Sequence, residues 1–318
     1  MVQKRNNTIL FGPLRFVLRR FVYGLLILIA LSAIAFFMLN NAPGDPTQMI
    51  LGQTWTPQRA KEVRITLGLD KPLIVRYFLW LCNALQGDLG RSYTTHEQVL
   101  LMITRALPNS LELAAASLLI ALPVGISIGI YSAVHRKSLL DYFSRVFAVS
   151  VSSMPIFWLG LLFIDFFAVQ MPLFPTGGIN GPLSIVLPAC SLAFYSLAGI
   201  VRMTRSSMLE VLRKDYVRTA RAFGFSERVV TYQHALRNAL IPVVTLSGLY
   251  LGTVIGSAII TEEVFAWPGL GSLIISGVFL RDTPVVLGGV LTVAVFYLMI
   301  NLCIDFVYVY LDPRIKLG

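Results

Sequence analysis

Charged residues are scarce in this chain. Only 13% of its 318 residues are Asp, Glu, Lys or Arg, and 56% are hydrophobic, whereas soluble domains carry about 25% charged and about 45–50% apolar residues. So little charge cannot cover the surface of a water-soluble protein of this length, which excludes a cytosolic enzyme and a disordered chain. The composition therefore predicts an integral membrane protein.

Cysteine is scarce as well, with three residues in the chain. Cys190 and Cys303 fall inside long apolar runs, and only Cys82 is predicted to lie outside them. A disulfide framework needs paired cysteines in an oxidising compartment. A disulfide-built secreted domain is therefore excluded.

Patterns for catalysis and metal binding are missing too. His96, His135 and His234 lie far apart, and none has a second His or Cys at helical spacing. Neither a Walker phosphate-binding loop nor a nucleophile elbow occurs. We predict no catalytic residue, no metal and no cofactor site in this chain.

Long apolar runs, by contrast, are abundant. A helix that spans a bilayer needs roughly 20 mostly apolar residues, and six runs of at least 18 residues contain no charged side chain: 21–44, 113–134, 146–164, 166–201, 238–261 and 283–304. They are continuously apolar rather than alternating, which indicates helices and not a barrel. The fold class is predicted to be an all-α membrane protein with six transmembrane helices.

The organisation of the chain follows from these runs. Proline and glycine interrupt the fourth run between 172 and 182, which predicts a turn there. We predict a cytoplasmic N-terminal segment at 1–20, spans at 21–39, 108–134, 145–171, 183–203, 240–262 and 285–310, external segments at 40–107 and 263–284, a cytoplasmic loop at 204–239 and a cytoplasmic tail at 311–318.

The net charge of +10 is explained by orientation. Of 26 basic residues, 18 lie on the side of the predicted termini: five before the first span, three between the second and third, eight between the fourth and fifth, and two at the end. The short segments on the other side contain only Arg281. Basic residues favour the cytoplasmic side, so both termini are predicted to be cytoplasmic, and the charge does not indicate nucleic acid.

The external segment 40–107 is predicted to be a small helical cap. Thr56-Pro57 and Lys71-Pro72 are helix-start signals, and Gly68 and Gly87 can end the two helices. Thr95 to Gln98 has the spacing of a capping box before another helix. The cap could dock an external protein or shape an outer vestibule, or it could be an interfacial collar.

Small residues and prolines mark the spans themselves. Gly125 and Gly129, and likewise Gly248, Gly252 and Gly256, recur every four residues, a spacing that lets another helix approach closely. Pro123, Pro155 and Pro188 are predicted to kink the second, third and fourth spans. The intramembrane acids Glu112, Asp165 and Asp305 fall near span ends, so a structural role is predicted for each.

The cytoplasmic stretch 202–237 carries eight basic and three acidic residues. Asp215 can cap a helix over 216–223 that ends at Gly224, and Ser226-Glu227 can start another. A short helix between turns could insert into a groove of a soluble partner. The alternative is a solvated basic loop.

This loop resembles a known family. It contains DYVRTARAFG followed by HALRNALIP, and the chain also contains, in order, NAPGDP, LGLDKPL, GDLGRSY, PNSLELA, EEVFAWPGLG and NLCIDFVYVYLDPRI. Together these segments resemble the permease subunits of peptide and nickel ABC importers, of the type with a long external loop after the first helix. The resemblance implies a type I importer fold.

The resemblance also implies a role for the loop. Arg218-Thr219-Ala220 occupies the places of the general family's Glu-Ala-Ala, and Gly224 occupies the glycine place, so the match depends on the subgroup's own pattern. The short helix would be a coupling helix seated in a cleft of an ATPase, and closure of two ATPases on ATP would swing the bundle between inward-open and outward-open states. The implied coupling residues are Asp215, Tyr216, Arg218, Thr219, Ala220, Arg221 and Gly224.

Further expectations follow from the resemblance. The implied partners are a homologous second permease, two cytoplasmic ABC ATPases that would bind ATP and Mg²⁺, an extracytoplasmic binding protein and membrane lipid, in a bacterial inner membrane. The implied external docking or gate residues are Glu262, Glu263, Trp267, Arg281 and Asp282.

The class of substrate stays open at this point. Peptides are the default for the family, and nickel chelates or glutathione-like compounds are the alternatives. A stand-alone secondary transporter or channel would be expected to show acids at mid-span or an inverted repeat, and a membrane-embedded enzyme would need paired catalytic residues; the sequence shows neither.

Overall fold

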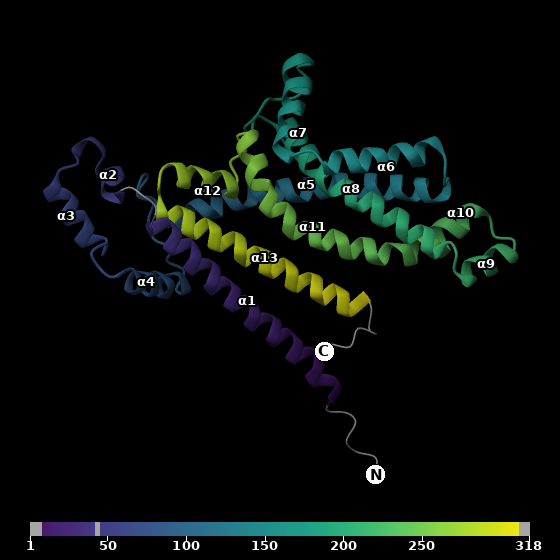
Figure 1. Cartoon of the computed structure of the whole chain (residues 1–318), viewed down its shortest axis with the longest axis horizontal. Coiled ribbons are helices and arrows are strands. Elements are labelled where there is room, and N and C mark those ends of the chain that lie inside the picture. Colours follow the sequence, from purple (N-terminus) through teal and green to yellow (C-terminus); the bar gives the residue numbers. More distant parts are fainter. Residues whose placement is uncertain (1–7, 42–44, 312–318) are drawn as a thin grey trace, which may run out of the picture. The chain divides into compact units, whose positions relative to one another are not determined.

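The computed structural model describes residues 8–41 and 45–311, and within them every element longer than an isolated β-bridge between Arg91 and Gln98 is helical. Figure 1 shows the helices in chain order. The prediction of an all-α fold is confirmed for this part of the chain.

In the part of the chain that the structure describes, five helices are long and apolar enough to cross a membrane, and a bent pair can supply a sixth span. The five are α1 (Thr8–Asn41), α5 (Val99–Val134), α8 (Val186–Val211), α11 (Leu236–Val264) and α13 (Thr283–Leu311). The bent pair joins α6 (Leu139–Ser152) to α7 (Ile156–Phe163) and the π-helical segment η2 (Ile164–Gln170).

The bend of this pair lies within the predicted third span, 145–171, at the proline for which a kink was predicted. The direction of the chain bends by 106° between the two helices, and α7 turns away from α6 in Figure 1. The cause lies at Pro155, which has no backbone N–H and disfavours helical geometry in the residue before it. The helix therefore ends at Ser152 and begins again at Ile156.

Other boundaries also differ from the predicted ones. Helix α5 begins at Val99, nine residues before the predicted span, and the capping box is not formed: the Thr95 hydroxyl accepts a hydrogen bond from the Glu97 N–H. Helix α8 runs on to Val211. Helix α12 (Leu270–Phe279) lies within 263–284, the segment predicted to be external, for which no helix was predicted.

The described chain forms two compact units. The first contains the residues up to 109 together with 268–302. Its buried apolar core includes Leu89, Val99, Ile274 and Val286. Helix α1 passes α13 so closely that a methyl group at Gly24 would collide with the Leu298 side chain.

Short helices after α1 complete the first unit: α2 (Pro46–Leu51), η1 (Gly52–Thr54), α3 (Pro57–Thr66) and α4 (Leu73–Leu85). The Thr56 hydroxyl accepts a hydrogen bond from the Arg59 N–H and caps α3, as its sequence predicts. Gly68 and Gly87 follow α3 and α4 with positive φ angles of 63° and 87°, which glycine adopts without a steric cost.

The second unit contains residues 110–267 and the described residues from 303 to 311. Helix α8 packs against α6, α7 and α11. A Cβ at Gly129 of α5 would lie 2.5 Å from Cβ of Thr204 of α8, so the predicted close approach at this glycine is confirmed. On α11 the same expectation holds at Gly248, which faces Ile304, but Gly256 faces open space.

Between α8 and α11 the chain forms α9 (Asp215–Ala222), α10 (Glu227–Val229) and the π-helical segment η4 (Val230–Ala235). These elements lie at one end of α8 and α11 (Figure 1). The π-helical segment η4 leads directly into α11, so α10, η4 and α11 form one uninterrupted helix from residue 227 onward.

Candidate functional site

The helix predicted in the loop is α9, and it has two different faces. Val217 and Ala220 are buried against Ile130, Met208 and Val230 in a core shared with α5, α8 and η4. The remaining residues of the helix are exposed. An isolated eight-residue helix is unstable in water, so burial of the inward face holds α9 in place.

The N-terminal end of α9 differs from its prediction. Lys214, with extended backbone angles, occupies the N-cap position and Asp215 is the first helical residue. The Asp215 side chain is 98% exposed and does not cap the helix. A carboxylate in the first turn still interacts favourably with the helix dipole.

The C-terminal end is closed by a Schellman motif. Gly224 has φ +81°, its N–H donates to the Arg221 carbonyl over 2.9 Å, and the N–H of Phe225 donates to the Ala220 carbonyl over 3.4 Å. This pattern needs a left-handed residue after the helix, which explains the glycine. The predicted stop at Gly224 is confirmed.

The implied coupling residues differ in exposure and in their contacts. Arg218, Thr219 and Gly224 are exposed, as is Asp215, whose carboxylate lies 3.9 Å from the Arg218 guanidinium. Ala220 is 6% exposed, and its side chain faces the core.

Arg221 and Tyr216 are exposed but already paired. The Arg221 guanidinium donates to both carboxylate oxygens of Glu227, over 2.8 and 3.2 Å, and this contact lowers the pKa of Glu227. The Tyr216 hydroxyl accepts a hydrogen bond from Asn238 of α11 over 2.9 Å. These two contacts fix the outward face of α9 against the elements that follow it.

Two exposed phenylalanines near the end of α9 were not among the predicted site residues. Phe223 is 78% exposed and Phe225 is 49% exposed, one on each side of Gly224. Large apolar side chains exposed beside a turn are typical of a docking surface. The signal in the sequence was the pattern Phe-Gly-Phe within a basic loop.

A polar groove lies at the end of α8, just before α9. It has a volume of about 570 Å³ and is lined by Arg205, Ser206, Leu209, Glu210, Arg213 and Lys214. The loop and this groove together present basic and aromatic groups on neighbouring parts of the same unit.

Behind the groove, a buried carboxylate connects three helices. Asp141 of α6 is 1% exposed and accepts hydrogen bonds from the Arg205 guanidinium of α8 over 2.7 and 3.1 Å. It also accepts from the Ser132 hydroxyl of α5 and from the Lys137 N–H. The arginine that lines the groove is thereby held by a buried ion pair.

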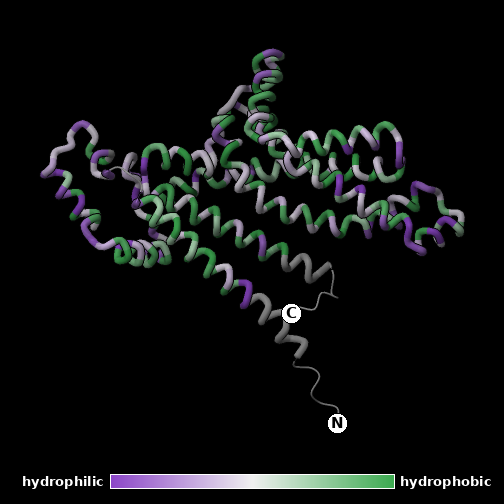
Figure 2. The backbone as a smooth tube through the Cα atoms, viewed as in Figure 1, coloured by the Kyte–Doolittle hydropathy of each residue, from purple (hydrophilic) through white to green (hydrophobic). Residues whose placement is uncertain are grey.

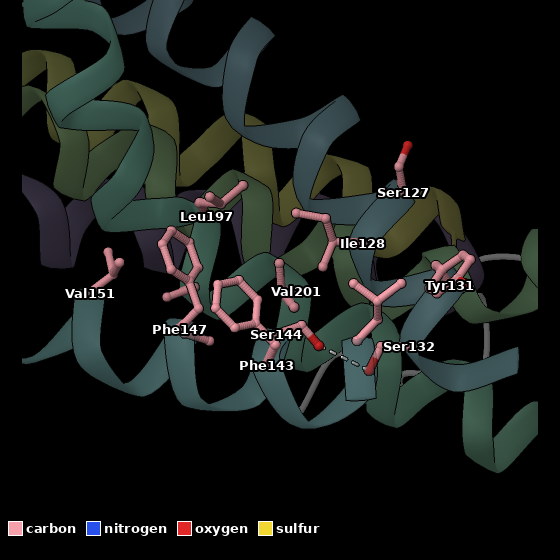
Figure 3. Close-up of a pocket in the computed structure, with 13 residues that line it drawn as sticks. Ser127, Ile128, Tyr131, Ser132, Phe143, Ser144, Phe147, Val151, Leu197 and Val201 are labelled. Carbon is pink, nitrogen blue, oxygen red and sulfur yellow. Dashed lines mark hydrogen bonds between the residues drawn. The ribbon is translucent and has the colours of Figure 1, made fainter. Parts of the chain in front are cut away.

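The same three helices enclose an apolar cavity of about 520 Å³ (Figure 3). Its polar groups are the hydroxyls of Ser127, Tyr131, Ser132 and Ser144. The Ser144 hydroxyl donates to the Ser132 hydroxyl over 3.3 Å, the contact drawn as a dashed line in Figure 3. The remaining lining residues are apolar. This cavity therefore lacks the charged groups that a polar substrate would need.

The candidate gate residues in the second unit are mostly buried. Glu262 is 0% and Trp267 is 3% exposed. The Glu262 carboxylate accepts from the Ser110 hydroxyl over 2.6 Å, and the backbone carbonyl of Glu262 accepts from the backbone N–H of Trp267 over 2.7 Å. The backbone bond closes the turn after α11, and Glu263 is the exposed residue of the three.

Asp282 and Arg281, in the first unit, show the same contrast. Asp282 is 1% exposed, and one of its oxygens, Oδ2, accepts hydrogen bonds from the Ser92 hydroxyl, the Thr94 hydroxyl and the Thr94 N–H over 2.5, 2.9 and 3.2 Å. Arg281 is exposed. Of the five implied docking or gate residues, Glu263 and Arg281 are therefore the accessible ones.

A structural role was predicted for three acids near the span ends, Glu112, Asp165 and Asp305. Glu112 is exposed, and Asp165 accepts a hydrogen bond from Gln170 over 2.8 Å. The side chain of Asp305 lies outside the described residues. Over residues 8–41 and 45–311, no group of three or more His, Cys, Asp and Glu side chains could hold a metal ion.

Two family models match this chain. The model described as the binding-protein-dependent transport system inner membrane component matches residues 125–317, and the model of its N-terminal part matches residues 13–114. The chain belongs to this family. It is a multi-pass inner membrane protein and a permease rather than an enzyme.

Individual relatives agree over nearly the whole chain. A dipeptide transport system permease protein DppB from Alkalihalophilus pseudofirmus is 38% identical, with 95% of this chain and 99% of the relative covered. A di/tripeptide transport system permease protein DppB from Pseudomonas aeruginosa is 39% identical with the same coverage. A putative peptide permease protein from Brucella suis is 42% identical, with 95% and 99% covered.

A solved structure shows the same fold. The inward-facing MetNI methionine ABC transporter matches with a TM-score of 0.52 and 18% identity, over 65% of this chain and 94% of the matched chain. The type I importer fold implied by the sequence is thereby confirmed. The chain is the transmembrane permease subunit of a binding-protein-dependent ABC importer, which rules out the stand-alone transporter.

Proposed function

We propose that this permease forms half of the translocation pathway for di- or oligopeptides. The relatives that match it from end to end carry peptide, dipeptide or di/tripeptide in their names. A homologous second permease would supply the other half, and an extracytoplasmic binding protein would deliver the peptide.

The loop around α9 is the proposed contact with the ATPases. The observation that supports it is the division of α9 into an inward face packed in the core and an outward face with Arg218, Phe223 and Gly224 exposed. Two separate ATPase subunits would bind ATP and Mg²⁺, and each would hold one coupling helix. Because α9 is packed against α5 and α8, movement of the helix is transmitted to two membrane helices.

The proposed orientation places both termini and this loop in the cytoplasm. Its support is the distribution of basic residues, with 18 of 26 on that side. The same orientation brings the basic groove at the end of α8 to the ATPase side, where it can contact acidic groups of the partner.

Phe223 provides the test of the coupling contact. In the assembled transporter in liposomes, we expect Phe223→Asp to lower transport and binding-protein-stimulated ATP hydrolysis together by about 30-fold, because a central exposed aromatic at an interface contributes about 2 kcal/mol. Leu139→Asp, at the start of α6, is the matched control, since Leu139 is 89% exposed and lies outside the loop. Equal activity of the two variants would exclude the coupling contact.

Gly224→Trp tests the same contact from the backbone. Its φ of +81° strains any other residue by about 1 kcal/mol or more, so the loop end should shift while the core around Val217 stays packed. The assembled complex should insert in the membrane and hydrolyse ATP without transport. Full transport by this variant would show that the loop end does not touch the ATPase.

The substrate class needs a separate experiment. The binding protein that stimulates the purified transporter is isolated, and its bound compounds are identified by mass spectrometry. We expect peptides, and unlabelled peptides should compete with transport of a labelled dipeptide. A nickel chelate or a glutathione conjugate in the binding protein would overturn the peptide assignment but leave the coupling contact intact.

A further inference from the structure

Helix α4 exposes apolar side chains where the sequence predicts an external cap. Its 13 residues, LIVRYFLWLCNAL, contain one charged side chain, Arg76. The large apolar residues on its exposed surface are Ile74 (63% exposed), Val75 (44%), Phe78 (58%), Leu79 (47%) and Leu85 (75%). An apolar surface of this kind needs a covering phase or partner.

The neighbouring helix α3 is entirely different. It has ten residues, of which four are charged: Arg59, Lys61, Glu62 and Arg64. Figure 2 shows the contrast, with α3 largely in the hydrophilic colours and α4 mostly in green. Two helices separated by a short turn thus carry the surfaces of two different environments.

The one charge of α4 points away from its exposed face. Nη2 of Arg76 donates to the side-chain oxygen of Asn40, near the end of α1, over 2.6 Å. The guanidinium also lies 6.0 Å from the ring centroid of Phe36. The exposed surface of α4 is therefore free of charged side chains.

Tyr77 shows how far α4 extends alongside α1. Its hydroxyl lies 2.9 Å from the Ser32 hydroxyl and donates to the Ile29 carbonyl over 3.1 Å. Ile29 precedes Asn40 by 11 residues, which is about 16 Å of helix rise. The apolar part of α1 runs over Arg19–Asn41, so Tyr77 reaches the middle of that span, whereas a helix above the bilayer would contact only its end.

We propose that α4 lies inside the non-cytoplasmic leaflet, packed against α1, with its exposed face covered by lipid acyl chains. Helix α1 also exposes large apolar side chains along the same stretch, where Ile34 and Met38 are 58% and 70% exposed. Helix α3 then lies in water, and the turn between Gly68 and Pro72 crosses the interface. The proposal rests on the proposed orientation of the chain in one respect only: the orientation decides which of the two leaflets contains α4.

Spin labels on the two helices test the proposal. The assembled transporter is reconstituted in liposomes of phosphatidylethanolamine and phosphatidylglycerol, with Cys82, Cys190 and Cys303 replaced by serine. Labels are attached at Phe78→Cys on α4 and at Glu62→Cys on α3 as the matched control. Power saturation then compares collisions with oxygen, which concentrates in lipid, and with a water-soluble nickel chelate.

For each label, the collision rate with oxygen is divided by the collision rate with the nickel chelate. We expect this ratio to be at least tenfold higher at Phe78→Cys than at Glu62→Cys. Equal ratios at the two sites would place α4 in water and overturn the proposal. Protection of the Phe78→Cys label from both reagents would also overturn it, because the covering group would then be protein, either the second permease or the binding protein.

The native cysteine provides a measurement without substitutions on α4. Cys82 is exposed on this helix. In intact vesicles, a membrane-permeant maleimide should modify Cys82 at least tenfold faster than a membrane-impermeant one, as read by mass spectrometry of the Cys82 peptide. Equal rates would contradict the lipid assignment, whereas labelling of Glu62→Cys only after permeabilisation would contradict the orientation alone.

Discussion

Asp141 and Asp282 are buried to the same extent, each 1% exposed, but they are stabilised in different ways. Asp141, in the second unit, meets the guanidinium of Arg205. Asp282, in the first unit, meets hydroxyls and an N–H of Ser92 and Thr94. One site compensates the carboxylate with an opposite charge, and the other relies on neutral donors.

The difference affects what each site can tolerate. Removing one partner of a buried ion pair leaves an uncompensated charge, which costs about 3–5 kcal/mol. Removing a neutral hydrogen-bond partner costs about 1–3 kcal/mol for each group left unsatisfied. We therefore expect the helix junction at Asp141 to depend on charge balance and the turn at Asp282 to depend on geometry.

The largest effect is expected for Arg205→Met. It leaves Asp141 buried without its charge partner, so the heat stability of the purified complex should fall by the equivalent of about 3–5 kcal/mol. Heating followed by size-exclusion chromatography measures the surviving fraction. Arg145→Met is the control. Arg145 also lies near the Asp141 carboxylate, but at the longer distance of 3.7 Å and with a side chain that is 52% exposed.

A double variant sharpens this prediction. Asp141→Asn with Arg205→Met removes both charges, and most of the lost stability should return because no uncompensated charge stays buried. Similar losses in Arg205→Met and Arg145→Met, or no recovery in the double variant, would contradict the ion-pair explanation.

A smaller effect is expected for Asp282→Ala. Ser92 and Thr94 lose their common acceptor, and the stability of the complex should fall by about 1–3 kcal/mol. Asp282→Asn should lose less, because its amide oxygen can still accept. The exposed neighbour Arg281→Ala should change stability by no more than about 0.5 kcal/mol, and a larger loss there than at Asp282 would refute the comparison.

The smallest effect is expected at the exposed pair of Arg221 and Glu227, which shows what an arginine contributes without burial. The hydrogen bonds from Arg221 lower the pKa of Glu227 below its ordinary value of 4.5. The contribution of this pair to the stability of the loop is therefore present above pH 4.5, and it is lost as the pH falls through the lowered pKa of Glu227. At neutral pH it should amount to less than about 1 kcal/mol.

Limited proteolysis of the loop measures this contribution. Glu227→Gln should be cleaved slightly faster than the unmodified chain at pH 7, and the difference should shrink as the pH is lowered toward 3 with an acid-active protease. A difference that grows at low pH would contradict the assigned direction of the pKa shift.

Much of the fold could be predicted from the sequence, because long apolar runs and helix caps are local signals. Thr56 caps α3 and Gly224 ends the Schellman motif after α9, as their sequence neighbours indicate. The 106° break at Pro155 was predicted only as a kink, since its size depends on what α7 packs against. Apolarity alone did not indicate that α4, predicted as part of an external cap, packs alongside α1.

The candidate site was less predictable, because burial is a property of the tertiary structure. Glu262 and Asp282 appear in a hydrophilic context in the sequence, but both are enclosed by partners far away in the chain, Ser110 and Ser92. Ala220 was assigned to a docking surface by family pattern, and it faces the core. The exposed aromatic Phe223 was not predicted as a site residue, because apolar residues are common throughout this chain.

The π-helical segment η4 sets the angular register between the coupling loop and α11. A π-helical turn holds one residue more than an α-helical turn, and one residue corresponds to about 100° of rotation. A change that restored regular α-helix here without removing a residue would therefore turn α11 by about that angle relative to α9, whereas deletion of one residue together with that change would leave its direction nearly unchanged. The π-helical segment thus decides which face of α11 is turned toward α9.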